Sequence, residues 1–268
     1  MYKLIAIDID DTLINDSKEV TPATQQALEQ AIDKGVIVTL ATGRAYSSAQ
    51  AIARQIGMNV PIITYQGSLV KNLLDEKVLY ERYVPMDAVR KVFDYCILHQ
   101  LHLQTYIDDK LFAREENQKL IDYTNLNRTE YFIEADVDKL ASHPTPKLLI
   151  IDEPDYLDEI APKLRELLGE DVHITKSKPN FLEIMHREGT KGHALKFLAA
   201  HFGCDMSQTI AIGDSWNDHE MLEAAGLGVA MGNAIPALKE LADYVTLSNN
   251  EDGVKVAIDK FVLNPEQA

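Results

Sequence analysis

Four short polar segments, far apart along the chain, carry residue types that can bind a metal ion or a phosphate group. They are Asp8-Ile9-Asp10-Asp11-Thr12, Ala41-Thr42-Gly43-Arg44, Thr190-Lys191-Gly192 and Gly213-Asp214-Ser215-Trp216-Asn217-Asp218. The first and the last contain several carboxylates, which would repel one another at one site unless a cation neutralised them. Oxygen ligands favour a hard cation such as Mg²⁺. The four segments therefore predict a site that combines a nucleophile, a metal ion and a phosphate group.

Asp8 and Asp10 are the candidate catalytic residues. Their side chains lie two positions apart in an extended segment and so project from the same face. An Asp carboxylate can attack phosphorus and form an aspartyl-phosphate that water then hydrolyses. We expect Asp8 to attack phosphorus or bind metal, and Asp10 to serve as acid and base. Thr12 is expected to bond to the backbone of the loop.

Thr42, Gly43 and Lys191 are candidate phosphate ligands. The hydroxyl of Thr42 and the backbone N–H groups beside it precede a predicted helix, a position that suits a phosphate oxygen. A simple helix cap would use the same residues. Lys191 stands at a predicted helix N-terminus, where the helix dipole disfavours a cation. An anionic partner would explain that placement, and a solvated surface lysine is the alternative.

The last segment completes the predicted metal site. Asp214 follows a buried strand and would bind the metal ion directly, while Asn217 and Asp218 would hold metal-bound water or phosphate oxygens. Capping of the helix that follows is the alternative explanation. Together with the first segment, the predicted metal ligands are Asp8, Asp10, Asp214 and Asp218.

Strands and helices alternate at both ends of the chain. Buried strands are predicted at Lys3–Ile7, Val36–Leu40 and Pro61–Tyr65, with a helix after each of the first two. The alternation resumes at Thr190 and continues through a buried strand at Thr209–Ile212. This order predicts one parallel sheet with right-handed crossovers. Ligands of such sheets gather outside the carboxyl ends of the strands, so the four segments should meet there.

The middle of the chain follows another pattern. Between residues 83 and 187, isolated strands are mixed with two clear helices, and a hairpin is expected near Leu73–Glu76. The predicted fold class is therefore α/β, with a Rossmann-like parallel-sheet core and an inserted α+β cap domain. The core would comprise residues 1–82 and 188–268, and the cap residues 83–187 would fold above the carboxyl edge of the sheet.

Composition narrows the possible partners. The formal charge of −16 disfavours nucleic acid and anionic membrane, because both reward clustered Lys and Arg. No apolar run reaches the roughly 18 to 20 residues of a membrane span. The start of the chain shows no pattern of a signal peptide, and Cys96 and Cys204 lie far apart without ligand spacing. We therefore expect a cytoplasmic protein with reduced thiols, of undetermined oligomeric state.

The motifs, in this order and spacing, resemble the haloacid dehalogenase superfamily of aspartate-nucleophile phosphatases, and within it the Cof-type branch with a C2-type cap. Two further segments typical of that branch are Pro179-Asn180-Phe181-Leu182-Glu183-Ile184 and Met231-Gly232-Asn233-Ala234. Two positions depart from the pattern. Asp11 replaces a glycine that is often present there, and Gln66 stands where the branch usually has Asn. An Asn role in substrate contact therefore cannot be transferred to position 66.

The resemblance implies an Mg²⁺-dependent phosphatase that acts on small phosphorylated metabolites, such as sugar phosphates. Asp8 would attack phosphorus in line, and Asp10 would protonate the leaving alcohol and then deprotonate the hydrolytic water. Mg²⁺ would be held by Asp8, the Asp10 carbonyl and Asp214, while Thr42 and Lys191 hold the other phosphate oxygens.

The cap would close over this site and contact the leaving group. Asn180, in the turn Lys178-Pro179-Asn180, is the first candidate for substrate contact. A purely structural role in the turn is the alternative.

Three other functions compete with this interpretation. A phosphomutase would share every catalytic residue and differ only in returning the phosphoryl group to the substrate, so analysis of the products would separate the two. A response-regulator-like receiver also phosphorylates an Asp, but its acceptor lies on a mid-sheet strand rather than the first strand, and it has no large insertion. A catalytically inactive binding module is disfavoured because every expected catalytic side chain is present.

Overall fold

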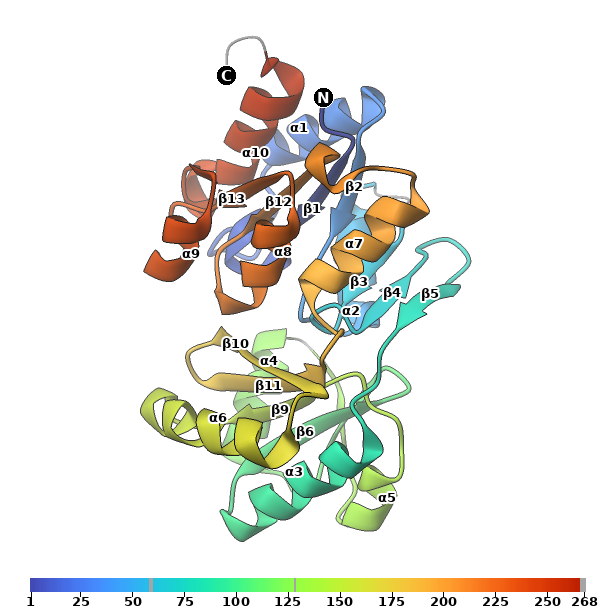
Figure 1. Cartoon of the computed structure of the whole chain (residues 1–268), viewed down its shortest axis with the longest axis vertical. Helices are drawn as coiled ribbons and strands as arrows, with labels where there is room; N and C mark the ends of the chain where they lie inside the picture. Colours follow the sequence, from blue (N-terminus) through green and yellow to red (C-terminus); the bar gives the residue numbers. More distant parts are fainter. Residues whose placement is uncertain (58–59, 128, 266–268) are drawn as a thin grey trace.

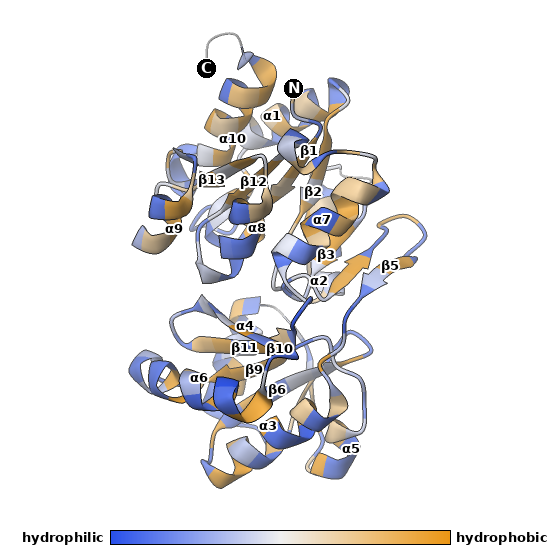
Figure 2. Ribbon diagram, viewed as in Figure 1, coloured by the Kyte–Doolittle hydropathy of each residue, from blue (hydrophilic) through white to orange (hydrophobic). Residues whose placement is uncertain are grey.

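The computed structural model describes residues 1–57, 60–127 and 129–265 and shows two parts, a core and a cap (Figure 1). Residues 58, 59, 128 and 266–268 belong to the predicted core and cap ranges but lie outside the described residues. The two parts are joined by two hydrophilic connections (Figure 2). Among the described helices, none combines the length and apolar character needed to cross a membrane.

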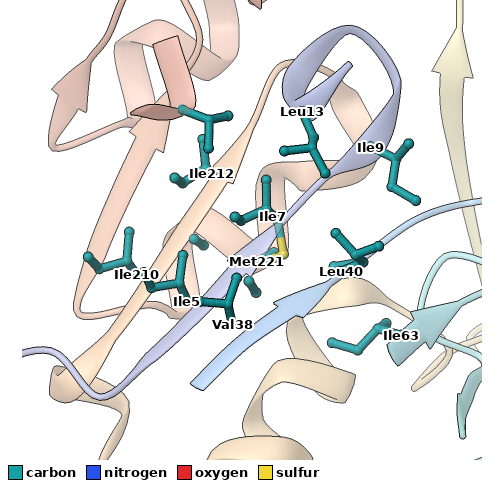
Figure 3. Close-up of a cluster of buried hydrophobic side chains, with 14 of the residues drawn as sticks. Ile5, Ile7, Ile9, Leu13, Val38, Leu40, Ile63, Ile210, Ile212 and Met221 are labelled. Carbon is teal, nitrogen blue, oxygen red and sulfur yellow. The ribbon is translucent and has the colours of Figure 1, made fainter. Parts of the chain in front are cut away.

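A five-stranded parallel sheet forms the centre of the core, in the order β14-β13-β12-β1-β2. Strand β1 is fully buried and lies between β2 and β12, with Ile7 opposite Leu40 and Ile212. Figure 3 shows the apolar side chains of these strands packed together. The strands are β1 (Leu4–Ile7), β2 (Ile37–Leu40), β12 (Thr209–Gly213), β13 (Leu227–Ala230) and β14 (Tyr244–Val245). Because β1, β2 and β12 run in parallel, the segments that follow them emerge at one edge.

Helices cover this sheet and begin close to where the sequence predicts them. Thr21 caps the first helix by accepting a hydrogen bond from the Thr24 N–H, and Pro22 occupies its first position. A short 3₁₀ turn (Trp216–Asp218) precedes the helix that follows the last polar segment. The core helices are α1 (Pro22–Asp33), α2 (Tyr46–Gln55), α7 (Lys191–His201), α8 (His219–Ala224), α9 (Pro236–Leu241) and α10 (Gly253–Ile258).

The third predicted strand does not join the parallel sheet as expected, and that part of the prediction is wrong. Strand β3 (Ile62–Thr64) pairs antiparallel with β4 (Leu69–Lys71), which pairs antiparallel with β5 (Val78–Glu81). Within the described residues, the only parallel pairing of β3 is an isolated bridge between Ile63 and Ala41, the residue that follows β2. The tight turn after β3 explains its antiparallel pairing with β4, because so short a connection can join only antiparallel neighbours. The expected hairpin near residues 73–76 is present between β4 and β5.

The cap has a six-stranded sheet in the order β10-β11-β9-β6-β7-β8, and β10, β11 and α4 face the core (Figure 1). Its strands are β6 (His102–Ile107), β7 (Lys110–Ala113), β8 (Tyr131–Ile133), β9 (Leu148–Ile151), β10 (Val172–Lys178) and β11 (Phe181–His186). The described cap residues form four helices where two were expected: α3 (Met86–Leu98), α4 (Gln118–Asn127), α5 (Val137–Ala141) and α6 (Pro154–Leu168). The predicted fold class, a parallel-sheet core with an α+β insertion, is confirmed.

The two connections between core and cap are held together where the sequence analysis places the domain limits. The Arg82 guanidinium lies 2.8 Å from the Glu188 carboxylate. All strands of the cap sheet fall between residues 83 and 187. We propose these positions as the limits of the cap domain.

Gly67 should be essential for packing the β3–β4 turn against the segment before α7. Its φ is +111°, and an added Cβ would overlap the backbone carbonyl of Thr190. Gly35 also has a positive φ, +81°, but open space around it. We predict that Gly35→Ala costs about 1–2 kcal/mol of unfolding free energy. Gly67→Ala should cost at least about 2 kcal/mol more, because the backbone must move.

Urea unfolding of the two variants and the parent protein measures this difference. Equal losses for Gly67→Ala and Gly35→Ala would show that the turn tolerates a side chain and that the close approach to Thr190 is unimportant.

Candidate active site

A pocket lies between the carboxyl edge of the main sheet and the cap. Its wall in the core includes Asp8, Asp10, Thr42, Gly43, Asp214 and Asn217, all of which were predicted from the sequence. Its wall in the cap includes Tyr123, Lys147, Ser177, Lys178, Phe181 and Glu183. The two parts of the chain therefore share one cavity.

Asp8 stands directly after β1, with 5% of its surface exposed. Its Oδ1 atom lies 2.5 Å from the Nζ atom of Lys191. Burial raises the pKa of Asp8 well above its usual value. The charge of Lys191 opposes this rise, whereas the neighbouring carboxylates add to it. Asp8 is therefore a carboxylate that the fold keeps away from water and balances with one buried cation.

Lys191 is completely buried at the first position of α7. Its Nζ atom also lies 2.6 Å from Oδ1 of Asp218. Burial alone would lower the pKa of Lys191, but Asp218 and Asp8 raise it above its usual value. The anionic partner expected for this lysine is therefore present as two carboxylates. Lys191 and Asp218 lie behind the pocket wall and not on it.

Asp218 organises the loop after β12. Its Oδ2 atom accepts hydrogen bonds from the N–H groups of Asp214, at 2.9 Å, and Ser215, at 3.1 Å. A side chain at Gly213 would overlap the Asp218 carboxylate, which explains the glycine. Both oxygens of Asp218 are thus engaged by protein donors, so its first role is to hold Lys191 and the loop.

Asp214 faces the pocket and accepts a hydrogen bond of 2.9 Å from the Thr12 hydroxyl. Thr12 was expected to bond to backbone, so this detail of the prediction is wrong: the short loop after β1 brings its hydroxyl to a carboxylate instead. Burial and then Asp218 raise the pKa of Asp214 to about 7. A second positive charge nearby, in addition to that of Lys191, would stabilise the ionised form of Asp214.

The donor set fits a hard divalent cation. Carboxylate oxygens of Asp8, Asp214 and Asp218 lie within 4.8 Å of one another. The side-chain Oδ1 atom of Asn217, a residue of the pocket wall, is buried and finds no hydrogen-bond partner among the described residues. Oxygen-only ligands of this kind favour Mg²⁺-like ions. The Asp10 carboxylate is not in this group, so only its backbone carbonyl remains as the ligand that the resemblance implies.

Asp10 instead forms a paired contact with Arg44. The Arg44 Nε and Nη2 atoms donate to its two carboxylate oxygens at 2.7 and 2.8 Å. Burial alone would raise the pKa of Asp10, but the hydrogen bonds and charge of Arg44 lower it overall. The next residue, Asp11, has a positive φ of 59°, a conformation that glycine adopts easily and Asp tolerates. This explains how Asp11 can occupy a position where relatives often have glycine.

The loop after β2 is arranged to offer a hydroxyl to an anion. The Arg44 N–H donates to the Thr42 hydroxyl oxygen at 3.1 Å, which leaves the hydroxyl hydrogen free to donate. Gly43 lies under the Gln66 side chain, and an added Cβ would overlap the Gln66 amide. Thr42 and Gly43 are therefore placed as predicted, beside the carboxylates of the first segment.

Gln66 is a site residue whose role the sequence did not reveal. It is 1% exposed, accepts a 2.8 Å hydrogen bond from the Asn217 side chain, and donates to Glu183 of the cap. Lys147 lies 3.0 Å from Glu183 and donates to the Gly43 carbonyl oxygen at 2.7 Å. A signal for the cap pair exists in the sequence, because Lys147 and Glu183 are charged residues beside or within apolar strands, and buried charges need partners.

Asn180 lies in the turn between β10 and β11, and the structure does not bring it to the pocket wall. Its carbonyl oxygen accepts a hydrogen bond from the Asp152 N–H at 3.3 Å. Ser177 and Lys178, on the strand before the turn, line the pocket. Phe181 and Glu183, on the strand after the turn, line it too, so the hairpin faces the site with its strands and not with Asn180.

The fold and the site together define an α/β protein with a parallel-sheet core, an aspartate at the end of its first strand and a cap over the pocket. Comparison with known proteins gives the family: its model, described as haloacid dehalogenase-like hydrolase, matches residues 5–258. The chain belongs to this family. The family expected from the motifs is thus confirmed, and so is the enzyme class, a hydrolase acting on phosphoric monoesters.

Relatives match over almost the whole chain. The Bacillus subtilis protein named 5-amino-6-(5-phospho-D-ribitylamino)uracil phosphatase YitU is 33% identical, with 94% of each chain covered. Phosphatase YwpJ of the same organism is 32% identical, with 94% of this chain and 97% of the relative covered. A haloacid dehalogenase-like hydrolase from Bacteroides thetaiotaomicron, solved by crystallography, has a TM-score of 0.86 at 30% identity, over 97% of this chain and 100% of its own.

Lys191→Met should be strongly destabilising, because it leaves Asp8 and Asp218 buried without a cation. The expected loss of unfolding free energy is roughly 3–5 kcal/mol. Hydrolysis of a simple phosphomonoester should fall by at least about 10²-fold. Denaturant unfolding and steady-state kinetics measure the two effects.

Lys196→Met, on the same helix but exposed, is the matched control and should change stability by no more than about 0.5 kcal/mol. Similar results for the two variants would contradict the role given to Lys191.

Proposed function

We propose that this protein is an Mg²⁺-dependent phosphatase that hydrolyses small phosphorylated metabolites through an aspartyl-phosphate intermediate. The observation that carries the proposal is the position of Asp8. It is a buried carboxylate at the end of β1, held by Lys191 and within 4.8 Å of further carboxylate oxygens. It faces a pocket whose other wall is a cap.

In the first step, a carboxylate oxygen of Asp8 attacks phosphorus in line while the bond from phosphorus to the leaving oxygen breaks. Lys191 engages Oδ1, and Oδ2 has no protein donor in the described residues, so Oδ2 is the attacking atom. The leaving oxygen takes a proton from Asp10. Water then attacks the phosphorus of the aspartyl-phosphate, Asp10 takes the proton of that water, and the Asp8 carboxylate is released with inorganic phosphate.

Asp10 must carry a proton for the first step, and Arg44 opposes this by lowering its pKa. Arg44 must therefore weaken its hold on Asp10 when substrate enters, for example by turning toward the negative phosphoryl oxygens. Arg44 lines the same pocket and is within reach of this exchange. When Arg44 pairs with Asp10 again, it lowers the pKa of Asp10 and so favours the deprotonated form that the second step needs.

Mg²⁺, held by Asp8, Asp214 and the Asp10 carbonyl, would offset the charge that develops on the transferred phosphoryl group. Further positive charge comes from Lys191, which opposes the rise in the pKa of Asp8 and orients its carboxylate. The Thr42 hydroxyl and the Gly43 N–H would hold phosphoryl oxygens, with the side-chain amide of Asn217 anchored on Gln66 beside them. Positioning and fixed charges thus supply most of the rate enhancement.

The leaving group should be small and hydroxyl-rich, as in sugar phosphates and polyol phosphates. The cap side of the pocket, where the leaving group would lie, is lined by polar and aromatic side chains: Tyr123, Ser177, Lys178 and Phe181. The name of YitU describes a substrate with a phosphorylated ribityl chain, which belongs to the same chemical class. Free cysteines at positions 96 and 204 are compatible with the cytoplasmic location that forms part of this proposal.

A panel of phosphorylated metabolites, assayed for phosphate release with and without Mg²⁺, tests the proposal. We expect turnover of sugar or polyol phosphates that EDTA abolishes and added Mg²⁺ restores. Asp8→Asn should remove detectable turnover, because an amide oxygen is a poor nucleophile. Full activity in metal-free buffer, or in Asp8→Asn, would refute the mechanism. Recovery of an isomeric phosphate ester instead of free phosphate would identify a mutase.

The pH profile provides a separate test of the Asp10–Arg44 pair. Because Arg44 lowers the pKa of Asp10, Arg44→Met should raise it. Asp10 must be protonated to serve as acid in the first step, which kcat/KM reports, so the basic limb of the kcat/KM profile should move to higher pH. Arg54→Met, an exposed position on helix α2, which follows Arg44 in the chain, is the control and should leave the profile in place. An unchanged basic limb in Arg44→Met would show that Asp10 does not set it.

A further inference from the structure

Helix α2 has no N-cap residue of its own. It begins directly after Ala45, which cannot accept a hydrogen bond through its side chain. The first N–H groups, those of Tyr46 and Ser47, instead donate to the two carboxylate oxygens of Asp109, at 2.9 and 3.0 Å. Asp109 belongs to the cap and lies more than sixty positions further along the chain. The cap therefore supplies the N-cap of a core helix.

The geometry of the cap hairpin makes this contact well defined. Asp108 and Asp109 form the two-residue turn between β6 and β7, and both have positive φ values, +50° and +62°. This is the arrangement of a tight type I′ hairpin turn. Asp109 also accepts a 2.6 Å hydrogen bond from the Tyr65 hydroxyl, which comes from the turn after β3. A carboxylate at a helix N-terminus is favoured by the helix dipole.

The helix that Asp109 caps is continuous with the proposed phosphate-binding loop. Thr42, Gly43 and Arg44 end one residue before its N-cap position. The cap holds the other end of this segment too, since Lys147 Nζ donates to the Gly43 carbonyl oxygen at 2.7 Å. Both ends of residues 43–47 are thus bonded to cap side chains, and all of these contacts are lost if the cap lifts.

We propose that Asp109 is a positioning residue that couples closure of the cap to ordering of the phosphate-binding loop. When the cap is seated, Asp109 caps α2 and fixes the loop that presents the Thr42 hydroxyl and the Arg44 guanidinium. When the cap lifts, the first turn of α2 loses its acceptors and the loop loosens. This inference rests on the proposed function, which assigns the loop to the phosphoryl group.

Coupling of this kind works in both directions. A phosphate group that binds better to the ordered loop must also favour the seated cap, by the same factor. The site would therefore bind phosphate most tightly when bulk water is excluded, and would release it when the cap opens. Asp109 touches neither the substrate nor the catalytic carboxylates, so its effect passes through the loop.

The test compares Asp109→Gly with Asp108→Gly. Glycine accepts the positive φ at both positions, so the turn is kept, and only the first variant loses the cap of α2. Amide hydrogen exchange of Tyr46 and Ser47 should become about tenfold faster in Asp109→Gly, as expected for a lost N-cap, and stay unchanged in Asp108→Gly. The affinity for inorganic phosphate should fall by a similar factor in Asp109→Gly alone. For any ester that is turned over, KM should rise more than kcat falls.

Asp109→Asn is the conservative variant, because Asn tolerates the positive φ and keeps one acceptor oxygen. It should restore part of the exchange protection and of the phosphate affinity. Equal exchange rates at Tyr46 and Ser47 in all variants would overturn the proposal, as would equal losses in the two glycine variants. The exchange measurement needs no turnover. It therefore separates failure of this coupling from failure of the proposed phosphatase activity, which the parent protein alone would reveal on the metabolite panel.

Discussion

The buried ammonium group of Lys191 is the interaction on which the site depends. It lies between Asp8 and Asp218, and all three groups are almost fully removed from water. A lone buried carboxylate is costly, and two side by side are more so. The charge of Lys191 offsets the cost of burying these two carboxylates. Asp218 in turn holds the loop of Asp214 by accepting hydrogen bonds from two backbone N–H groups. Segments from both ends of the chain are thus fixed around one positive charge, and the excess of carboxylates that remains favours a second cation.

Much of this arrangement follows from the sequence because it is set by local rules. Buried apolar runs of four or five residues predict parallel strands, and polar residues directly after them fall at one edge of the sheet. Asp8, Thr42 and Asp214 could therefore be placed near one another. The family resemblance added the cap and the roles of the catalytic residues.

The contacts across the pocket could not be predicted in the same way. Gln66 meets Asn217 and Glu183 only after the turn at residues 65–67 and the cap have both folded. The direction in which Arg44 points, toward Asp10, likewise depends on the loop geometry after β2. Contacts between residues that lie far apart in the sequence produce no periodic pattern in that sequence. At most they leave an isolated charge in an apolar run, such as Glu183 in β11. The antiparallel pairing of β3 with β4 has a local cause, a tight turn, but strand composition alone did not show it.

The place of β1 in the sheet has a consequence for how the protein is made. This strand comprises residues 4–7, yet one of its two neighbours, β12, begins only at residue 209. During synthesis, most of the chain, including the whole cap, emerges before that neighbour exists. Until then one side of an entirely apolar strand presents unpaired N–H and C=O groups, the kind of edge that recruits other chains. The nascent protein therefore depends on rapid completion of its last sixty residues, or on a chaperone that shields this edge, to avoid aggregation.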